Sequence, residues 1–542
     1  MIRQDRRLIE VTRRQFIAGL GVAGAAASQW WSPVEIFAQR SGDSSRDETR
    51  PDRFSRIFDL PPFAEPSDRL LNALRALGAP GGLMDAKDPL QEGPIRLITN
   101  PELSPNNRDS TTNTAGVTFL GQFLDHDMTF DGTSRLGVPT PPETSPNART
   151  PAFDLDSVYG GGPTESPHLY DPNDRAKFKV ESGGLFEDLP RGSDGAAIIA
   201  DPRNDENLMI AGLHAAFLLC HNKCVDMLRQ TGEDRRLAEQ DSEGGLDFGD
   251  DESRRRRSVF QQARRLVTWH YQWIIVHEFL PHVIGASTVN DILRHGLRYY
   301  RPKEGEQSIP VEFQAAAYRF GHSMVRPSYR ANLAGDAGQP FFGFIFDPAG
   351  QGQADPVDLR GGARAPRRFI GWQTFFNFSG AQAANVRPSK VIDTKISTPL
   401  FNLPLGAIAS GDPPTALPQR NLLRHVTWSI PSGQAIAEAM RIPALSTSQL
   451  SELAQFGVGL ERSTPLWYYI LKEAELNGGG GLAGVGARIV GEVFIACLSL
   501  DSNSYLGADR RWTPTLPSRN PGTFTMVDFL TFAGVDPDSR GQ

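Results

Sequence analysis

Apolar residues recur at helical spacing along most of the chain after residue 95. A period near 3.6 residues is typical of helices that bury one face. Alternation of apolar and polar residues, which would indicate strands, is rare. We therefore predict a mainly α-helical single large domain of packed helices with very little β-structure. The predicted helices cover residues 205–230, 257–280, 310–325, 434–442, 448–457 and 484–499.

Three stretches interrupt this pattern and predict long loops. They are the Pro- and Thr-rich segment 136–151, the acidic and Arg-rich segment 231–257, and the Gly-rich segment 334–366. Residues 41–95 are rich in Pro, Asp and Arg and show little periodicity, which predicts an irregular arm packed on the main body. The main domain then covers residues 96–542.

The first forty residues predict an export signal. Arg13 and Arg14 precede an apolar stretch rich in Gly and Ala, an arrangement typical of twin-arginine signals. The stretch is shorter than the roughly 18 apolar residues of a membrane helix, and no later segment approaches that length. We expect a periplasmic or extracellular protein whose mature part does not span a membrane. Cleavage near Ala38 and an uncleaved anchor are both open.

The net charge, the cysteine content and the histidine spacing argue against several classes of protein. A net charge of −7 and a pI near 5.9 argue against a nucleic-acid partner. The three cysteines are too few for a disulfide framework, and Cys220 and Cys224 lie at helical spacing without the further ligands of a zinc site. His277 and His282 are five residues apart with a proline between them, which argues against a zinc hydrolase.

Four polar segments carry the candidate chemistry. In the first, His126 lies between Asp125 and Asp127, which is costly unless each group has a partner. Taken alone, this segment could be a polar cluster at a helix end. The other segments contain Arg203 within 201–206, His322 after 318–321, and Asn421 with Arg424.

In this order the four segments resemble the distal-His, catalytic-Arg, proximal-His and proximal-Asn segments of animal-type haem peroxidases, part of the peroxidase/cyclooxygenase superfamily. The resemblance spans roughly residues 95–510, and residues 431–434 and 464–469 resemble the bacterial branch in particular. It implies a haem-peroxidase domain with haem b. It also implies that hydrogen peroxide is reduced while a small phenolic or halide donor is oxidised.

The resemblance assigns roles that suit the residue types. His126 would be the distal base, because a neutral imidazole can take up and return a proton. Arg203 would stabilise the negative charge that develops as the O–O bond breaks. His322 would bind the haem iron and would donate a hydrogen bond to Asn421. The resemblance also makes Gln122 the distal glutamine and Arg424 a haem-binding residue.

Two further features follow from the same resemblance. Asp125 and Glu206 match positions from which relatives form ester bonds to haem methyl groups, although both could be ordinary hydrogen-bonded carboxylates. A calcium loop is implied within 150–160, where oxygens of Thr150, Ala152, Asp154 and Asp156 would join Asp127. Asp156 replaces a serine of many relatives, so we expect its charge to strengthen calcium binding. An acidic turn without a metal is the alternative.

Two other functions stay open. A fatty-acid dioxygenase of the same superfamily would use a tyrosine three residues before His322, where this chain has Arg319. Tyr318 is one residue further away, and a shift of about 100° around a helix predicts that it points elsewhere. An interaction or adhesion protein on a peroxidase scaffold would bind haem with little turnover. The donor and the oligomeric state are not predicted.

Overall fold

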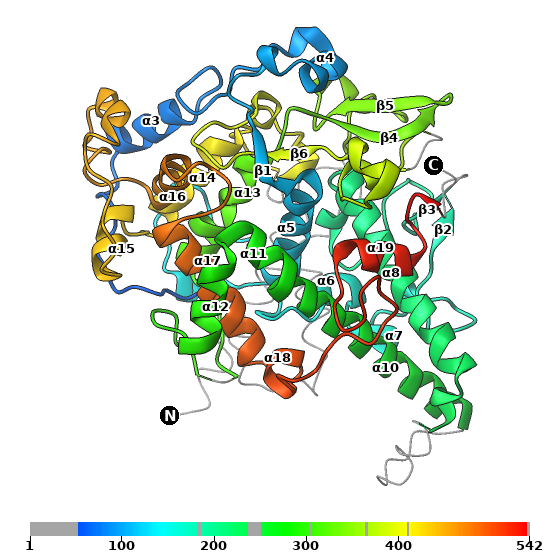
Figure 1. Ribbon diagram of the computed structural model, residues 1–542. Coiled ribbons are helices and arrows are strands. Elements are labelled where there is room, and N and C mark those ends of the chain that lie inside the picture. Colours follow the sequence, from blue (N-terminus) through cyan, green and yellow to red (C-terminus); the bar gives the residue numbers. More distant parts are fainter. Residues whose placement is uncertain are drawn as a thin grey trace, which may run out of the picture.

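The computed structural model describes residues 52–182, 186–236, 251–303, 305–363, 367–408 and 411–538. The predicted export signal, residues 1–40, lies outside these ranges. Packed helices joined by long irregular segments make up the described chain (Figure 1), which confirms the mainly α-helical prediction.

Helix α8 (Leu208–Gln230) packs against α5 (Ala115–Met128), α10 (Asp251–Ile274) and α19 (Met526–Ala533). It begins at Asn207, whose side chain accepts a hydrogen bond from the backbone N–H of Ile210. By length and composition α8 could cross a membrane, but most of its apolar stretch is buried inside the protein. It therefore has the burial of a core helix.

A second group of helices surrounds α17 (Gly484–Ser499), to one side of α5 in Figure 1. Helix α17 contacts α11 (Leu280–Ile284), α12 (Ala286–His295) and α16 (Leu466–Leu476). Helix α14 (Leu417–Thr427) packs on α16 and on α3 (Asp68–Leu77). The shorter helices are α4 (Gly93–Thr99), α6 (Asp156–Tyr159), α7 (Gly162–Glu165), α13 (Gly321–Met324), α15 (Gly433–Ala439) and α18 (Tyr505–Ala508).

Within the described residues, the strands form three two-stranded antiparallel sheets. Strand β1 (Asp109–Thr114) pairs with β6 (Pro388–Lys390), β2 (Glu181–Ser182) with β3 (Glu187–Asp188), and β4 (Ser328–Asp336) with β5 (Gln339–Phe344). The predicted loop 334–366 therefore begins with a hairpin. The glycines near the turn interrupt the apolar pattern, so the sequence did not predict these two strands. Their alternating burial depends on the pairing of β4 with β5.

The predicted helices differ from the observed ones mainly where the backbone is irregular. Residues 205–230, 434–442 and 484–499 correspond closely to α8, α15 and α17. Segment 310–325 is divided into a π-helical turn (Glu312–Ala316), a 3-10 turn (Ala317–Phe320) and α13. Segment 448–457 holds only a 3-10 turn (Ser451–Phe456).

The arm predicted over 41–95 is not irregular throughout, because α3 lies within its described part. Helix α3 begins at Ser67, whose hydroxyl accepts a hydrogen bond from the backbone N–H of Leu70, and it buries Leu74 and Leu77. The cap stabilises the start of α3, and the packing of α3 on α14 attaches this part of the arm to the main body.

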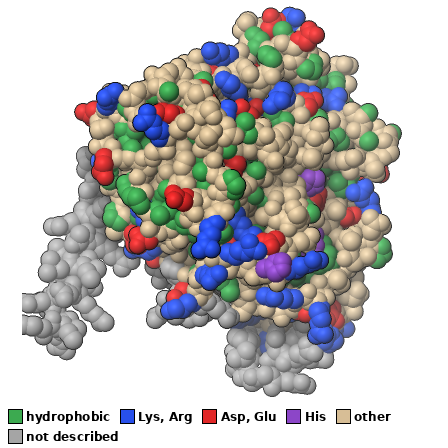
Figure 2. All heavy atoms as spheres, turned by 60° about the vertical axis from the view of Figure 1, so that its left-hand side comes forward, with side chains coloured by type: hydrophobic (Ala, Val, Ile, Leu, Met, Phe, Trp, Pro, Cys, Tyr) green, Lys and Arg blue, Asp and Glu red, His purple; other side chains and the backbone are tan. Residues whose placement is uncertain are grey.

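Cys220, Cys224 and Cys497 are all buried, and the burial of Cys220 and Cys224 agrees with their prediction as small core residues. On the face drawn in Figure 2, basic and acidic side chains are interspersed, with a group of Lys and Arg side chains near its lower edge. That face does not have the single-sign basic surface that a nucleic-acid site needs.

Candidate active site

A cavity of about 720 Å³ lies between α5, the turn Pro202–Asp205, α13 and α14. Both His126 and His322 line it, although they are almost two hundred positions apart in the chain. The volume is typical of small-molecule and cofactor sites. Of the candidate haem-site residues, the cavity wall includes Gln122, Asp125, His126, Arg203, Glu206, His322 and Arg424.

His126 lies near the end of α5 and is buried. Its Nδ1 lies 2.9 Å from Oδ1 of Asn204, and the amide nitrogen of Asn204 lies 3.5 Å from the carbonyl oxygen of Ser157. A carbonyl oxygen only accepts, so the Asn204 nitrogen faces Ser157 and its oxygen faces His126. His126 therefore donates through Nδ1–H, and its Nε2 keeps a lone pair for a proton.

The charge state of His126 suits a base. Burial and then the charge of Arg203 lower its pKa to about 4, while Asp201 and Asp125 act in the opposite direction. The ring is thus neutral near pH 7, with carboxylates nearby that favour its protonated form. The Asn204 nitrogen also lies 3.0 Å from Nδ1 of His214 on α8, which extends the network into the core.

Arg203 reaches the cavity from the 3-10 turn before α8 and not from the helix itself, which begins at Leu208. Its Nε and Nη2 donate to the two carboxylate oxygens of Asp201, at 3.0 and 2.8 Å. Nη2 also donates to the carbonyl of His126, at 3.0 Å, and the guanidinium lies 4.5 Å from the ring centre of Phe130. These contacts fix the cation beside the distal histidine.

Gln122 and Glu206 form a second polar pair on the same wall. The Gln122 amide nitrogen donates to Glu206 at 3.0 Å, and Asn207 donates to the Gln122 amide oxygen at 3.1 Å. Burial raises the pKa of Glu206 to about 8. Asp125 accepts a hydrogen bond from Thr129 and is about one-third exposed in the cavity. Both carboxylates are placed where a bound macrocycle could contact them.

His322 is held by α14. Its Nδ1 lies 2.8 Å from the amide nitrogen of Asn421, and Nη1 of Arg319 donates to the Asn421 oxygen at 3.1 Å. A guanidinium only donates, so the amide oxygen faces Arg319 and the amide nitrogen faces His322. We expected His322 to donate to Asn421; in the structure it accepts, because Arg319 fixes the orientation of the amide.

Among the described residues, the charged groups that shift the pKa of His322 are both arginines. Burial, followed by the charges of Arg319 and Arg424, lowers its pKa to about 3. Arg319 is itself partly buried, and desolvation and the Arg424 charge lower its pKa to about 9. Arg424 pairs with Asp131 at 2.7 Å, and Arg135 and Arg420 also line the cavity.

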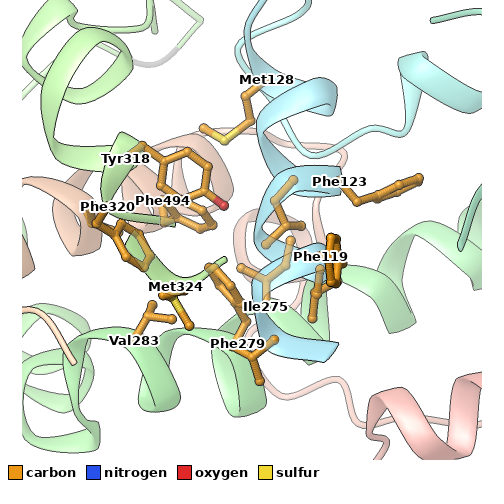
Figure 3. Packing of buried hydrophobic residues seen from close by; sticks show 14 of the residues in the cluster. Phe119, Phe123, Met128, Ile275, Phe279, Val283, Tyr318, Phe320, Met324 and Phe494 are labelled. Carbon is orange, nitrogen blue, oxygen red and sulfur yellow. The ribbon is translucent and has the colours of Figure 1, made fainter. Parts of the chain in front are cut away.

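The rest of the cavity wall is largely apolar. In Figure 3, Tyr318 and Phe320 lie beside Phe494 and face α5, with Met324 and Phe279 nearby. Our expectation that Tyr318 points elsewhere is wrong: it lines the cavity, and its hydroxyl donates to the carbonyl of Gly121 at 2.9 Å. The rotation argument assumed a continuous α-helix, whereas the segment before His322 is π-helical and then 3-10.

Three carboxylates lie close together, one of them on the residue that follows His126 in the chain. Oxygens of Asp127, Asp154 and Asp156 lie within 4.8 Å of one another, and Asp127 is fully buried. Burial and then the two neighbouring negative charges raise the pKa of Asp127. Thr150 donates to Asp156 through its N–H and its hydroxyl, at 3.2 and 3.1 Å, and Ala152 is buried in the same loop.

The expectation that Asp156 strengthens this site by its charge needs correction. Arg149, buried beside the loop, lies 3.5 Å from Asp156 and 2.6 Å from Asp201. The added carboxylate therefore has its own cation, so its charge is not simply added to those of Asp127 and Asp154. The sequence did not indicate this pairing, because Arg149 and Asp201 are far apart in the chain.

The residues present fit both groups that the resemblance implies. For haem, two histidines line one cavity with Nδ1 of each bound to an asparagine amide, and a Cβ added at Gly321 would meet no atom of the described chain within 4 Å. The Gln314 amide oxygen lies on this wall, buried and without a hydrogen-bond partner in the described chain. For calcium, the oxygen-only donors and mutually repelling carboxylates suit a hard cation.

Comparisons with known proteins find related sequences and folds. Residues 134–341 match the animal haem peroxidase family, a range that contains Arg203 and His322. The peroxidasin homolog pxn-2 of Caenorhabditis elegans is 23% identical over 284 residues, which are 47% of this chain and 18% of that protein. The matched part thus spans less than a fifth of that relative's length.

Solved structures share the fold at low identity. Peroxidase A of Dictyostelium discoideum superposes with a TM-score of 0.55 and 17% identity, over 90% of this chain and 95% of the other. A fatty acid alpha-dioxygenase of Oryza sativa gives a TM-score of 0.52 and 14% identity, over 84% and 79%. These likenesses establish the fold.

Proposed function

We propose that this chain, whose residues 134–341 match the animal haem peroxidase family, binds haem b and reduces hydrogen peroxide while oxidising a small phenolic or halide donor. The observation that carries this proposal is that the buried His126 and the partly buried His322 line one cavity. Each has Nδ1 bound to an asparagine amide, which leaves Nε2 directed to the space between them.

The bound group would be held from several sides. His322 would bind the haem iron, and the cations Arg135, Arg319, Arg420 and Arg424, which line the same cavity, would suit the propionate groups. When bound, haem supplies the redox chemistry of the reaction. Because Nδ1 of His322 accepts from Asn421, the neutral ring carries its proton on Nε2, and metal binding there releases that proton.

The distal residues would manage protons and charge. The lone pair on Nε2 of His126 accepts the proton from one peroxide oxygen and returns it to the other as water leaves. Nη1 of Arg203, the guanidinium nitrogen not bound to Asp201, stabilises the negative charge that develops during cleavage. Gln122, bound to Glu206 and Asn207, is oriented to hold a water beside them.

Asp125 and Glu206 are the candidates for ester bonds to the haem, since both carboxylates line the cavity. Denaturing electrophoresis after peroxide turnover would then leave haem on the polypeptide. Complete extraction of the haem by acidified organic solvent would contradict the ester bonds.

We also propose that Asp127, Asp154 and Asp156 bind calcium with Thr150 and the carbonyl of Ala152. Asp127 is adjacent to His126, and its oxygens accept from Leu155, Ser157 and Tyr271. A bound cation would neutralise the remaining repulsion and hold the end of α5 in register. The twin-arginine motif supports the further proposal that the enzyme acts outside the cytoplasm.

Fatty-acid oxygenation is the second candidate, and the observation that favours it is the phenol of Tyr318 on the apolar wall. The Arg319 side chain, three residues before His322, is bound to Asn421 and Gln314 and supplies no phenol there. Peroxide-driven donor oxidation and oxygen uptake with a fatty acid distinguish the two reactions.

The test uses the full chain reconstituted with haem. Phenol or bromide oxidation should depend on hydrogen peroxide, and oxygen uptake with a long-chain fatty acid should stay at background. Oxygen uptake without peroxide that is lost in Tyr318→Phe would support the dioxygenase instead. Haem binding without either reaction would support an interaction protein and contradict both enzymatic proposals.

A further inference from the structure

Asp201 is a buried carboxylate with two guanidinium partners. Its side chain has no exposed surface. One oxygen accepts from Nε and the backbone N–H of Arg203, at 3.0 and 2.9 Å, and the other from Nη2 of Arg203 and Nε of Arg149, both at 2.8 Å. Burial alone would raise the pKa of Asp201, but the charges of Arg149 and Arg203 bring it below its usual range.

Arg149 extends this contact to the carboxylate cluster. It is buried, its Nη2 donates to the carbonyl of Ala200 at 3.1 Å, and its Nη1 lies 3.5 Å from Asp156. The charges therefore alternate along one buried chain, from Asp156 through Arg149 and Asp201 to Arg203. Breaking such a chain at one member leaves an unpaired buried charge.

The geometry determines which part of Arg203 faces the cavity. Nε and Nη2 donate hydrogen bonds to Asp201, and Nη2 also donates to the carbonyl of His126. In the described chain, the nearest acidic neighbour of Nη1 is Asp125, at 4.0 Å. Holding two of the three guanidinium nitrogens leaves Nη1 as the donor directed toward the reacting group.

We propose that Asp201 and Arg149 are positioning residues for Arg203, forming a buried ion-pair chain that joins the carboxylate cluster behind His126 to the cation in the cavity. This inference rests on the proposed peroxidase function. It concerns orientation only, since neither residue lines the cavity. A displacement of about 1 Å in such a group can lower a rate by about a hundredfold.

Asp201→Asn is the first test, and Asp205→Asn is its matched control. Asp205 lies in the same turn and pairs with Arg191, at 2.7 Å, away from Arg203. We expect Asp201→Asn to retain haem but to lower the rate constant for hydrogen peroxide by about ten- to a hundredfold. Cyanide affinity, which reports the distal donors, should fall with it. Asp205→Asn should leave both unchanged.

A double-mutant cycle separates positioning from general stability. In an Arg203→Ala background, adding Asp201→Asn should change the peroxide rate by less than about twofold, because the group it positions is gone. A further loss as large as in the wild-type background would overturn the proposal. Arg149→Lys keeps the charge without the bidentate contact and should give an intermediate rate.

The haem-free chain gives a readout independent of activity. Asp201→Asn should unfold at a lower temperature than Asp205→Asn, because it removes the negative charge that pairs with the buried Arg149. Equal midpoints would contradict the buried chain. If Asp201→Asn does not fold, Asp201→Glu keeps the charge and should show the same slower peroxide reaction. A wild-type chain without peroxide reaction would refute the proposed function; wild-type rates in the folded Asp201 variant would refute only this inference.

Discussion

On the α5 side of the cavity, His126 lies among charges of both signs, whereas on the α13 and α14 side His322 lies beside two arginines and an amide. Both imidazoles are neutral near pH 7, because desolvation in the protein lowers the pKa of each ring. They differ in the direction of the hydrogen bond at Nδ1: His126 donates to the oxygen of Asn204, and His322 accepts from the nitrogen of Asn421.

The difference explains why one histidine suits a base and the other a ligand. Carboxylates near His126 can stabilise the imidazolium that forms when it takes a proton. Near His322 the cations oppose protonation, so the ring stays neutral and could bind iron through Nε2 once the proton on that nitrogen is released. The predictions below test this division between the two walls.

The largest effect is expected from His322→Ala. Loss of the axial ligand should abolish the native Soret spectrum and the peroxidase activity together. His295→Ala, which changes an exposed histidine on α12, is the control and should keep both. A native spectrum in the His322 variant would show that the iron ligand lies elsewhere.

His126→Ala should separate catalysis from binding. The variant should retain haem with an unchanged affinity, while its rate constant with hydrogen peroxide falls by about 10²–10⁴-fold, as is typical for loss of a general acid–base group. Stopped-flow mixing measures the rate, and a haem titration measures the affinity. A loss of haem affinity as large as the loss of peroxide rate would contradict the proposal that His126 serves catalysis and His322 serves haem binding.

The two asparagines provide a finer comparison. Asn421→Ala should weaken haem binding or activity by about 10–100-fold, since partners of metal ligands typically have effects of that size. Asn204→Ala should slow the peroxide reaction without weakening haem binding, because its oxygen orients only His126. Identical effects on haem affinity in the two variants would contradict the assignment.

Metal removal should give the smallest effect, confined to the α5 side. Exhaustive chelation should lower the unfolding temperature and the peroxide rate several-fold, because the repelling carboxylates lie behind His126. Asp154→Ala should reproduce the loss. Metal analysis that finds no calcium in active enzyme, or chelation that leaves both values intact, would reduce the cluster to an acidic loop.

Much of the fold and of the site could be predicted from the sequence. The apolar spacing within α8 and α17 defines their bounds closely, and the resemblance selects His126, Arg203 and His322, which line one cavity. Periodicity fails before His322, where the backbone is π-helical and then 3-10, and this is why the position of Tyr318 was predicted wrongly.

The supporting contacts could not be predicted in the same way. Asp201 carries a local signal, since an aspartate before proline is typical of the start of a helical turn. Its pairing with Arg149 joins residues from separate loops, and the orientation of Asn421 depends on Arg319 from another segment. Such partners follow from packing, which one sequence without coordinates does not specify.

The most direct test of the account is a stopped-flow measurement on the haem-loaded wild-type chain at neutral pH. Mixing with one equivalent of hydrogen peroxide should change the Soret band at a rate proportional to peroxide, and a phenolic donor should then restore the original spectrum. The same mixing with His126→Ala should be slower by about 10²-fold or more. Equal rates in the two proteins, or an unchanged spectrum in the wild type, would contradict the account.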